Sequence, residues 1–177
     1  MSNLQVKPVT SETEKLMYDR AFLRELRHMV EDFNCDYADT LDRGEVEKWP
    51  DFFTDDGVYR LIARDNAESN LPLPLMYCDG KGMLKDRAYA IAHTEMFAPR
   101  YTMHQIAQVR ILGFEDGIVS AQANYVLYET LIDEPTHLLQ CGKYHDRFLL
   151  RGDRLLLKER NCIYDTLLIP TCIVFPP

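Results

Sequence analysis

The most regular apolar pattern in the chain is found in FLRELRHMVEDFNCDYADTL, from Phe22 to Leu41. Apolar side chains recur there at steps of three and four residues, with charged residues between them. The apolar set is Phe22, Leu26, Met29, Val30, Phe33, Tyr37 and Leu41. A period near 3.6 residues predicts one long amphipathic helix, and Gly44 is placed to end it.

Outside this helix the pattern is mostly that of strands. The expected strands are residues 58–63, 105–114, 118–132, 137–150 and 155–168, with a short one near 75–78. The pairs Asp116-Gly117 and Gly152-Asp153 are typical of tight hairpin turns. Residues 65–74 contain two prolines and predict a loop. A short apolar set at 46–53 and an Ala-rich run at 82–97 predict two further helices.

Helices that precede a series of hairpin-linked strands indicate the α+β class. Long antiparallel strands twist strongly and can curl, so we expect a mostly antiparallel sheet wrapped around the long helix. We interpret residues 1–10 as a loose arm and residues 11–177 as a single domain that ends in an apolar tail. A chain of 177 residues can bury a core without disulfide bonds or a metal.

Charge and cysteine content narrow the class of protein. The formal net charge is −8, and no run of Lys and Arg forms a basic stripe, which argues against binding to nucleic acid or to an anionic membrane surface. No apolar run approaches the length of a membrane span, and the N-terminus does not resemble a signal peptide. The five cysteines lack tight spacing. We therefore expect a cytoplasmic protein with free thiols.

Motifs for metal binding are missing from the sequence. The paired Cys-x-His and Cys-x-x-His clusters of a Rieske centre do not occur, and neither does a C-x-x-C pair for zinc. His137, Cys141 and His145 would share one face of a strand. Neighbours four residues apart are about 13 Å apart along a strand, too far to share one metal. The sequence therefore predicts no metal or cofactor site in this chain.

A site without a metal is the remaining candidate for chemistry. A curled sheet over a helix leaves a conical cavity at its open end, near which His93, His104, Asp36 and Tyr37 could act in proton abstraction or dehydration. Asp36 and Tyr37 point about 100° apart on a helix, so they cannot both face one small pocket. We favour the alternative in which Tyr37 belongs to the apolar stripe, Asp36 is solvated and the histidines make ordinary hydrogen bonds.

Three stretches together resemble a known family. LDRGEVEKWPDFFTDDGVYRL (41–61) resembles the start of the cystatin-like cone, also called the nuclear transport factor 2-like fold. PRYTMHQIAQVRILGFEDGIVSAQANYVLYET (99–130) and CGKYHDRFLLRGDRLLLKERNCIYDTLLIPTCIVFPP (141–177) resemble the small (β) subunit of bacterial aromatic-ring-hydroxylating dioxygenases. The main markers are His104, Val109 and Ile111 in one strand and Gly142-x-Tyr144-x-Asp146-Arg147 in another.

This resemblance implies a division of labour between two subunits. The large (α) subunit of the family carries the Rieske [2Fe–2S] cluster and the mononuclear iron, and the β subunit carries neither. The β subunit has no catalytic residues, and it usually joins α in an α3β3 assembly. A non-catalytic β subunit for the degradation of aromatic compounds, with some likeness to subunits for aromatic acids, is thus the main hypothesis. There are two alternatives. One is a stand-alone dehydratase or isomerase that uses His93, His104 and Tyr37, and the other is a small-ligand binding module.

The apolar tail after Asp165 is the candidate subunit interface. It contains no charged residue, and its prolines cannot donate to a sheet, so it should not continue the sheet as an inner strand. Alternation would let half of its side chains face the protein's own sheet and half face a partner. The residues expected at the interface are Leu168, Ile169, Ile173, Val174 and Phe175.

Overall fold

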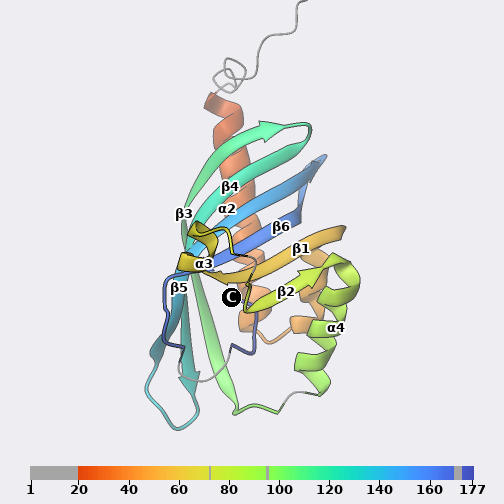
Figure 1. Cartoon of the computed structure of the whole chain (residues 1–177). Helices are drawn as coiled ribbons and strands as arrows, with labels where there is room; N and C mark the ends of the chain where they lie inside the picture. Colours follow the sequence, from red (N-terminus) through yellow and green to blue (C-terminus); the bar gives the residue numbers. More distant parts are fainter. Residues whose placement is uncertain (1–19, 72, 95, 170–172) are drawn as a thin grey trace, which may run out of the picture.

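The computed structural model describes residues 20–71, 73–94, 96–169 and 173–177. The expected arm at residues 1–10 lies outside these ranges. Within them, the chain forms one curled sheet with helices packed against it (Figure 1), which confirms the α+β prediction. In the part of the chain that is described, no helix is long and apolar enough to cross a membrane.

The long helix predicted from the apolar period is α2, Arg20–Asp42. Its fully buried side chains fall at steps of three and four residues, and they are Leu26, Val30, Asn34, Tyr37 and Leu41. Gly44 follows with a φ of +72°, a left-handed conformation that glycine adopts without steric cost, and the helix ends there as predicted.

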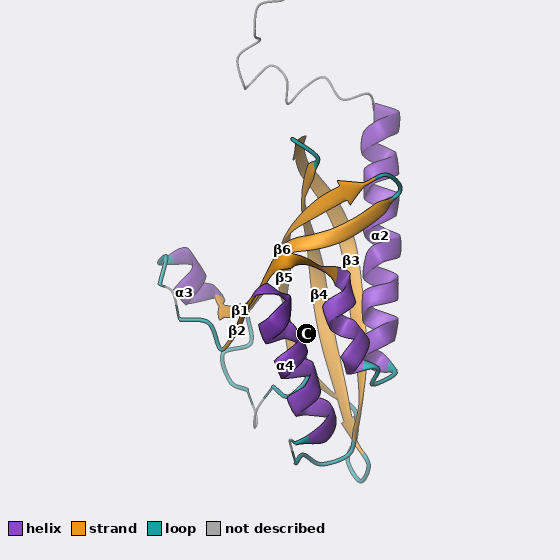
Figure 2. Cartoon of the chain, turned by 90° about the vertical axis from the view of Figure 1, so that its right-hand side faces the viewer, coloured by secondary structure: helices purple, strands orange, loops and turns teal. Residues whose placement is uncertain are grey.

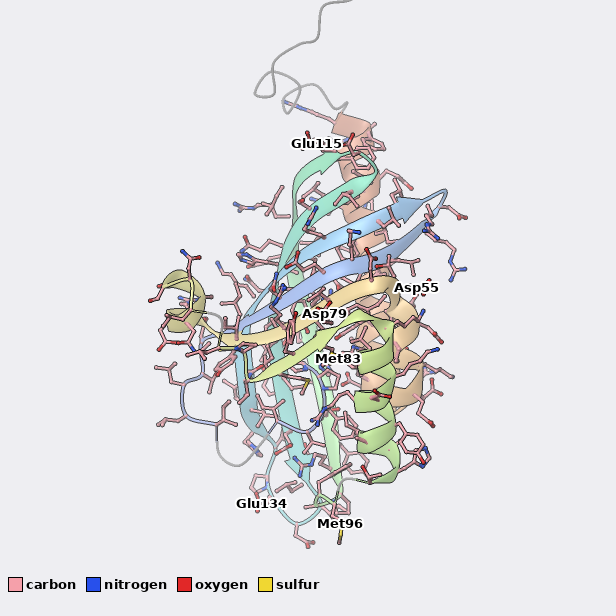
Figure 3. All side chains as sticks on the ribbon, turned by 45° about the vertical axis from the view of Figure 1, so that its right-hand side comes forward. Asp55, Asp79, Met83, Met96, Glu115 and Glu134 are labelled. Carbon is pink, nitrogen blue, oxygen red and sulfur yellow. The ribbon has the colours of Figure 1, made fainter. Side chains whose placement is uncertain are left out.

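The sheet contains six strands in the order β2-β1-β6-β5-β4-β3. They are β1 (Phe53–Ala63), β2 (Met76–Asp79), β3 (Arg100–Glu115), β4 (Ile118–Leu131), β5 (His137–Arg151) and β6 (Arg154–Tyr164). All neighbours are antiparallel except β1 and β6, which are parallel. The hairpin turn after Glu115 and the loop around Glu134 lie at opposite ends of the long strands (Figure 3).

Several boundaries differ from the sequence-based expectations, since β1 begins at Phe53, β3 begins at Arg100 and α4 ends at His93. Two further differences concern a loop and the last strand. Residues expected to form a loop begin instead with a short helix, α3, Arg64–Glu68, whose five residues include no buried side chain and so give no apolar pattern. The strand expected to run to residue 168 ends at Tyr164. Tyr164 is the last residue of β6 that pairs with either neighbour, with Ala63 of β1 and Gly142 of β5.

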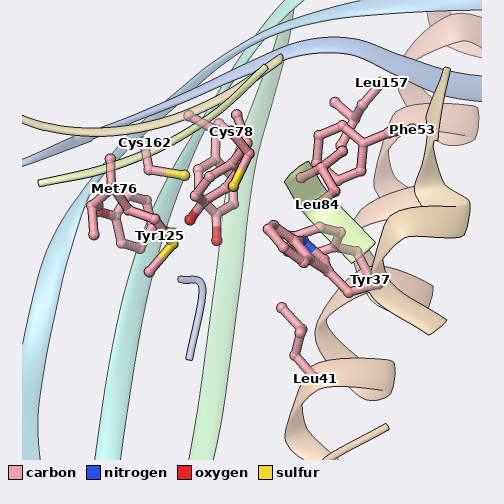
Figure 4. Close-up of a cluster of buried hydrophobic side chains, with 14 of the residues drawn as sticks. Tyr37, Leu41, Phe53, Met76, Cys78, Leu84, Tyr125, Leu157 and Cys162 are labelled. Carbon is pink, nitrogen blue, oxygen red and sulfur yellow. The ribbon is translucent and has the colours of Figure 1, made fainter. Parts of the chain in front are cut away.

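The remaining helices cover the inner face of the sheet. A 3-10 helix, η1 (Val46–Phe52), contains Pro50, and α4 (Gly80–His93) packs on η1 and β1 (Figure 2). The buried side chains between these layers form one apolar core, part of which is shown in Figure 4. The described end of the chain lies among these layers in both views.

Close approach of two strands beside this core depends on Gly142 in β5. A Cβ atom added there would lie 2.1 Å from the carbonyl oxygen of Ile163 and 2.8 Å from the Cα atom of Tyr164. Only glycine therefore lets β5 and β6 come this close, just where both strands border the interior.

Candidate functional site

A charged pair lies in the interior of the cone. Asp146 of β5 and Arg160 of β6 are directly paired across the two strands. Arg160 Nε donates to Asp146 Oδ1 at 3.0 Å, and its Nη2 donates to Asp146 Oδ2 at 2.8 Å and to Asn34 Oδ1 of α2 at 2.6 Å. The Arg160 side chain is 0% exposed, so the pair is fully removed from solvent.

Aromatic rings enclose the Arg160 guanidinium. Its carbon lies 4.1 Å from the ring centroid of Tyr144 and 4.3 Å from that of Tyr37, distances at which a cation attracts the ring face. Burial alone would lower the pKa of Arg160, but Asp146, Tyr37 and Tyr144 together raise it well above its usual value. Burial also raises the pKa of Tyr144. The site therefore holds a permanent cation between un-ionised phenols.

Residues 173–177, here called the closing segment, end beside this pair. The main-chain oxygen of Pro177 accepts hydrogen bonds from Tyr37 Oη at 3.4 Å and from Tyr59 Oη at 3.2 Å. Cys162 Sγ donates to the same oxygen at 3.6 Å. Trp49 Nε1 donates to Tyr37 Oη at 3.0 Å, which orients that hydroxyl. Burial raises the pKa of Cys162 to about 12, so its thiol stays protonated and can donate.

The closing segment is held along its length by side chains of α4 and of the loop that comes after it. Arg87 Nη2 donates to the carbonyl oxygen of Val174 at 2.9 Å, and the rings of Phe97 and Phe175 meet edge to face at 5.4 Å. Ile173 and Val174 are buried. The conical interior that the sequence suggested as a cavity is thus occupied by the chain's own closing segment.

The residues proposed for proton chemistry belong to three separate hydrogen-bond groups. Tyr37 lies with Trp49 and the closing segment. The Nδ1 atom of His104 lies 2.6 Å from a carboxylate oxygen of Asp42 at the end of α2, and its Nε2 is buried without a partner among the described residues. His93 Nε2 lies 3.1 Å from Glu47 on the surface. The structure does not join them through shared hydrogen bonds.

The positions of Asp36 and Tyr37 agree with the favoured interpretation. Asp36 is exposed on α2, whereas Tyr37 next to it is fully buried in the core. His93 and His104 each make a hydrogen bond to a carboxylate.

The three residues considered for a metal site have separate environments. His137 Nε2 lies 3.3 Å from Glu129, the Cys141 backbone N–H donates to Thr166, and His145 is exposed on the outer face of β5. Among the described residues, no group of three or more His, Cys, Asp or Glu side chains is arranged to hold a metal ion.

Sequence reasoning missed the Arg160–Asp146 pair. One available signal was the alternation in β5, which places Gly142, Tyr144, Asp146 and Phe148 on a single face, and all four are buried. A carboxylate in such an apolar series needs a buried cation as its partner. Arg160 could have been identified in this way, because it alternates with the buried Cys162 and Tyr164 in the adjacent strand.

The expected interface residues fall into two groups. Leu168 is 90% exposed and Ile169 is partly buried against the core. Ile173 and Val174 are buried in the closing segment, and Phe175 is partly buried there. Ile169 and Ile173 also line a surface groove of about 570 Å³, together with Leu75, Met76, Tyr77, Cys78, Met83 and Arg87.

Known proteins match this chain over most of its length. It is 30% identical over 140 residues to the small subunit of anthranilate 1,2-dioxygenase from Burkholderia cepacia, covering 79% of this chain and 87% of that subunit. It is 28% identical over 144 residues to subunit beta 1 of the terminal oxygenase component of terephthalate 1,2-dioxygenase from Comamonas, covering 81% of this chain and 94% of that subunit.

A solved structure shows the same agreement. The crystal structure of a protein from Novosphingobium aromaticivorans, assigned as the beta subunit of an aromatic-ring-hydroxylating dioxygenase, is 42% identical and superposes with a TM-score of 0.79. The match covers 87% of this chain and 97% of that one. A model of the ring hydroxylating beta subunit family matches residues 37–171. This chain therefore belongs to the ring hydroxylating beta subunit family, as its sequence resemblance implied.

Proposed function

We propose that this protein is the non-catalytic β subunit of a cytoplasmic dioxygenase that hydroxylates an aromatic acid. Its partner is a large α subunit, which carries the Rieske [2Fe–2S] cluster and the mononuclear iron. Three copies of each subunit form an α3β3 assembly. Membership of the family supports the α partner, and the anthranilate and terephthalate dioxygenases among its relatives support an aromatic acid as the substrate.

The observation that best supports the non-catalytic role is the difference in side-chain burial between the inside and the outside of the cone. The interior is filled by the core and the closing segment, with Val174 5% exposed. On the outside, Leu167 and Leu168 are 67% and 90% exposed. A subunit that packs its own interior and leaves large apolar side chains outside is suited to contact with a partner.

The proposed interface is the surface groove together with the exposed leucines beside it. Leu168 and Ile169 contact the partner directly. Ile173, Val174 and Phe175 support this surface from below, because they anchor the chain on the inner side. Other exposed side chains that line the groove, among them Leu75 and Tyr77, extend the apolar area. Obligate interfaces are large and resemble a core in composition.

Within the assembly, the task of this subunit is positioning. A closed three-fold ring requires heterologous contacts that repeat identically around the axis. By fixing the α subunits in such a ring, the β subunit holds the cluster of one α subunit near the iron of its neighbour. Its own side chains contribute buried surface and no step of the reaction.

Co-expression with a candidate α subunit from the same organism tests the proposal. Native mass spectrometry should show an α3β3 complex, and the purified β subunit alone should hydroxylate no aromatic acid. Turnover of a small molecule by the chain alone, or failure to bind α, would contradict the proposed role.

A pair of substitutions tests the interface. Leu168→Asp places a charge in the proposed contact and should reduce the yield of complex at least tenfold, because a buried unpaired charge is costly. Leu112→Asp is the matched control, since Leu112 is also exposed but lies in β3. An equal loss with both variants would contradict the assignment of the interface to this groove.

A further inference from the structure

We propose that the interior of the cone is a latent binding site for a small aromatic carbonyl compound, and that the closing segment occupies it in the intact chain. This goes beyond the proposed function, because it concerns a ligand of the β subunit itself and does not depend on assembly with α. The inference rests on three features of the interior: convergent donors, aromatic walls and unused polar atoms.

Three donors from three different elements converge on one oxygen atom. Tyr37 of α2, Tyr59 of β1 and Cys162 of β6 all direct a hydrogen towards the main-chain oxygen of Pro177. One oxygen atom of this kind offers two lone pairs, so three donors exceed the number that this single atom accepts in good geometry. The same arrangement would accept the oxygen of a ligand amide, ketone or carboxyl group.

The walls around this oxygen are aromatic. Trp49 meets Tyr59 edge to face at 5.1 Å and Phe53 at 5.6 Å. Tyr125 and Tyr144 stack at 4.5 Å on the sheet side. Figure 4 shows Tyr37, Tyr125 and Cys162 directed into this region from the helix and the strands. Rings in such arrangements favour a flat aromatic ligand over an aliphatic one.

Polar atoms near the closing segment remain without partners. The described contacts leave Arg160 Nη1, Tyr144 Oη and Asn34 Nδ2 buried and unbonded. They belong to one cluster, because Arg160 donates to Asn34 and lies over the Tyr144 ring. An unsatisfied buried polar atom is costly, so this interior carries more hydrogen-bonding capacity than its present occupant uses.

The intact chain should bind such a ligand weakly. The buried aliphatic side chains of Ile173 and Val174 stabilise the closed arrangement, and the segment is covalently attached. A ligand competes with this tethered segment for the same site. The apparent affinity of the ligand is therefore reduced in proportion to the small fraction of molecules in which the segment has left the site. Removal of the segment should therefore reveal the site.

The test compares three proteins with benzamide as the probe. They are the intact chain, a chain shortened after Cys172, and a full-length Val174→Ser variant in which the segment is only loosened. Trp49 is the single tryptophan, and its indole N–H bonds to Tyr37 in the site, so its NMR signal reports occupancy. We expect a Kd below about 1 mM for the shortened chain, a value in the range of small fragments. The intact chain should bind at least tenfold more weakly, with Val174→Ser in between.

Three further measurements define the site. Tyr59→Phe in the shortened chain removes one donor and should weaken benzamide binding by about fivefold, the value of one hydrogen bond. The free peptide Ile-Val-Phe-Pro-Pro should displace benzamide. Benzene, which has no acceptor oxygen, should bind more weakly than benzamide.

Several outcomes would overturn the inference. One is a shortened chain that folds but shows no binding when the benzamide concentration is about 10-fold above the expected Kd. If the shortened chain does not fold, the Val174→Ser variant is the test. A folded Val174→Ser variant that binds benzamide no better than the intact chain would contradict the inference. Benzene binding equal to benzamide binding, with no effect of Tyr59→Phe, would reduce the site to an unspecific apolar cavity.

Discussion

Two neighbouring residues of β6 show how differently charges behave on the two faces of this sheet. Arg160 points inward, is fully buried, and is paired with Asp146. Glu159 points outward with 24% of its side chain exposed, and it pairs with Arg60 and, at 3.8 Å, with Arg147. Both are cross-strand ion pairs, yet water reaches only the outer one.

This difference determines the cost of losing one partner of each pair. On the outer face, water replaces the missing partner, and the ion pair contributes at most a modest stabilisation. On the inner face, a missing partner leaves an uncompensated charge in a medium that solvates it poorly. The inner pair therefore constrains the fold much more strongly than the outer one.

The largest effect is expected for Asp146→Ala. This change leaves the Arg160 guanidinium buried without its carboxylate, and we expect a loss of about 3–5 kcal/mol in the free energy of unfolding. Urea denaturation followed by circular dichroism measures it. The matched control is Arg147→Ala, the next residue, which points outward and should cost less than about 1 kcal/mol. Similar losses in the free energy of unfolding for both variants would contradict the difference between the two faces of the sheet.

An intermediate effect is expected for the closing segment. Ile173 is 8% exposed, so Ile173→Ala should lower the free energy of unfolding of the isolated chain by about 2 kcal/mol. Leu168→Ala changes a side chain that is 90% exposed and should alter it by less than about 0.5 kcal/mol. In the presence of α, Leu168→Ala should instead weaken assembly. Equal destabilisation of the isolated chain by both changes would contradict the inner and outer assignments.

The smallest effect is expected for Glu159→Gln, and it should depend on pH. Burial alone would raise the pKa of Glu159, but hydrogen bonds from Asn161 and Arg60 and the charge of Arg60 hold it below its usual value. A depressed folded-state pKa means that ionised Glu159 stabilises the fold above the unfolded-state pKa, and this is lost as the pH falls through the folded-state value.

The expected cost of Glu159→Gln is therefore about 0.5–1 kcal/mol at pH 7, and it should shrink towards zero at about pH 3. Thermal unfolding of both proteins across this range measures the difference. A cost that stays constant down to about pH 3 would show that the charge of Glu159 is not the cause.

Much of the framework could be predicted from local sequence patterns. The helical period from Phe22 to Leu41 predicted α2, and the glycines at 117 and 152 occupy the hairpin turns, both with positive φ. These features depend on neighbouring residues and on the conformations that glycine permits. The end of β6 could not be predicted in this way, because the apolar pattern continues past Tyr164, whereas the pairing with the distant strands β1 and β5 does not.

The contents of the interior also lay beyond local patterns. Alternation shows that Asp146 and Arg160 each share a face with apolar neighbours, but only the pairing of β5 with β6 brings the two charges together. The hydrogen bond between Tyr37 and Pro177 joins residues 140 positions apart. No periodicity reports such a contact, because it arises from the curl of the whole sheet.

The sequence by itself determined the helix, the turns, the class of fold and the family, since each depends on short-range spacing or on a continuous series of residues. The tertiary structure alone decided that the apolar end of the chain divides into an exposed part at Leu167 and Leu168 and a buried part at residues 173–177. The physical reason is that apolar residues favour burial wherever a surface is offered. The curled sheet, with its helices, offers the inner part of the tail such a surface and leaves the outer part uncovered.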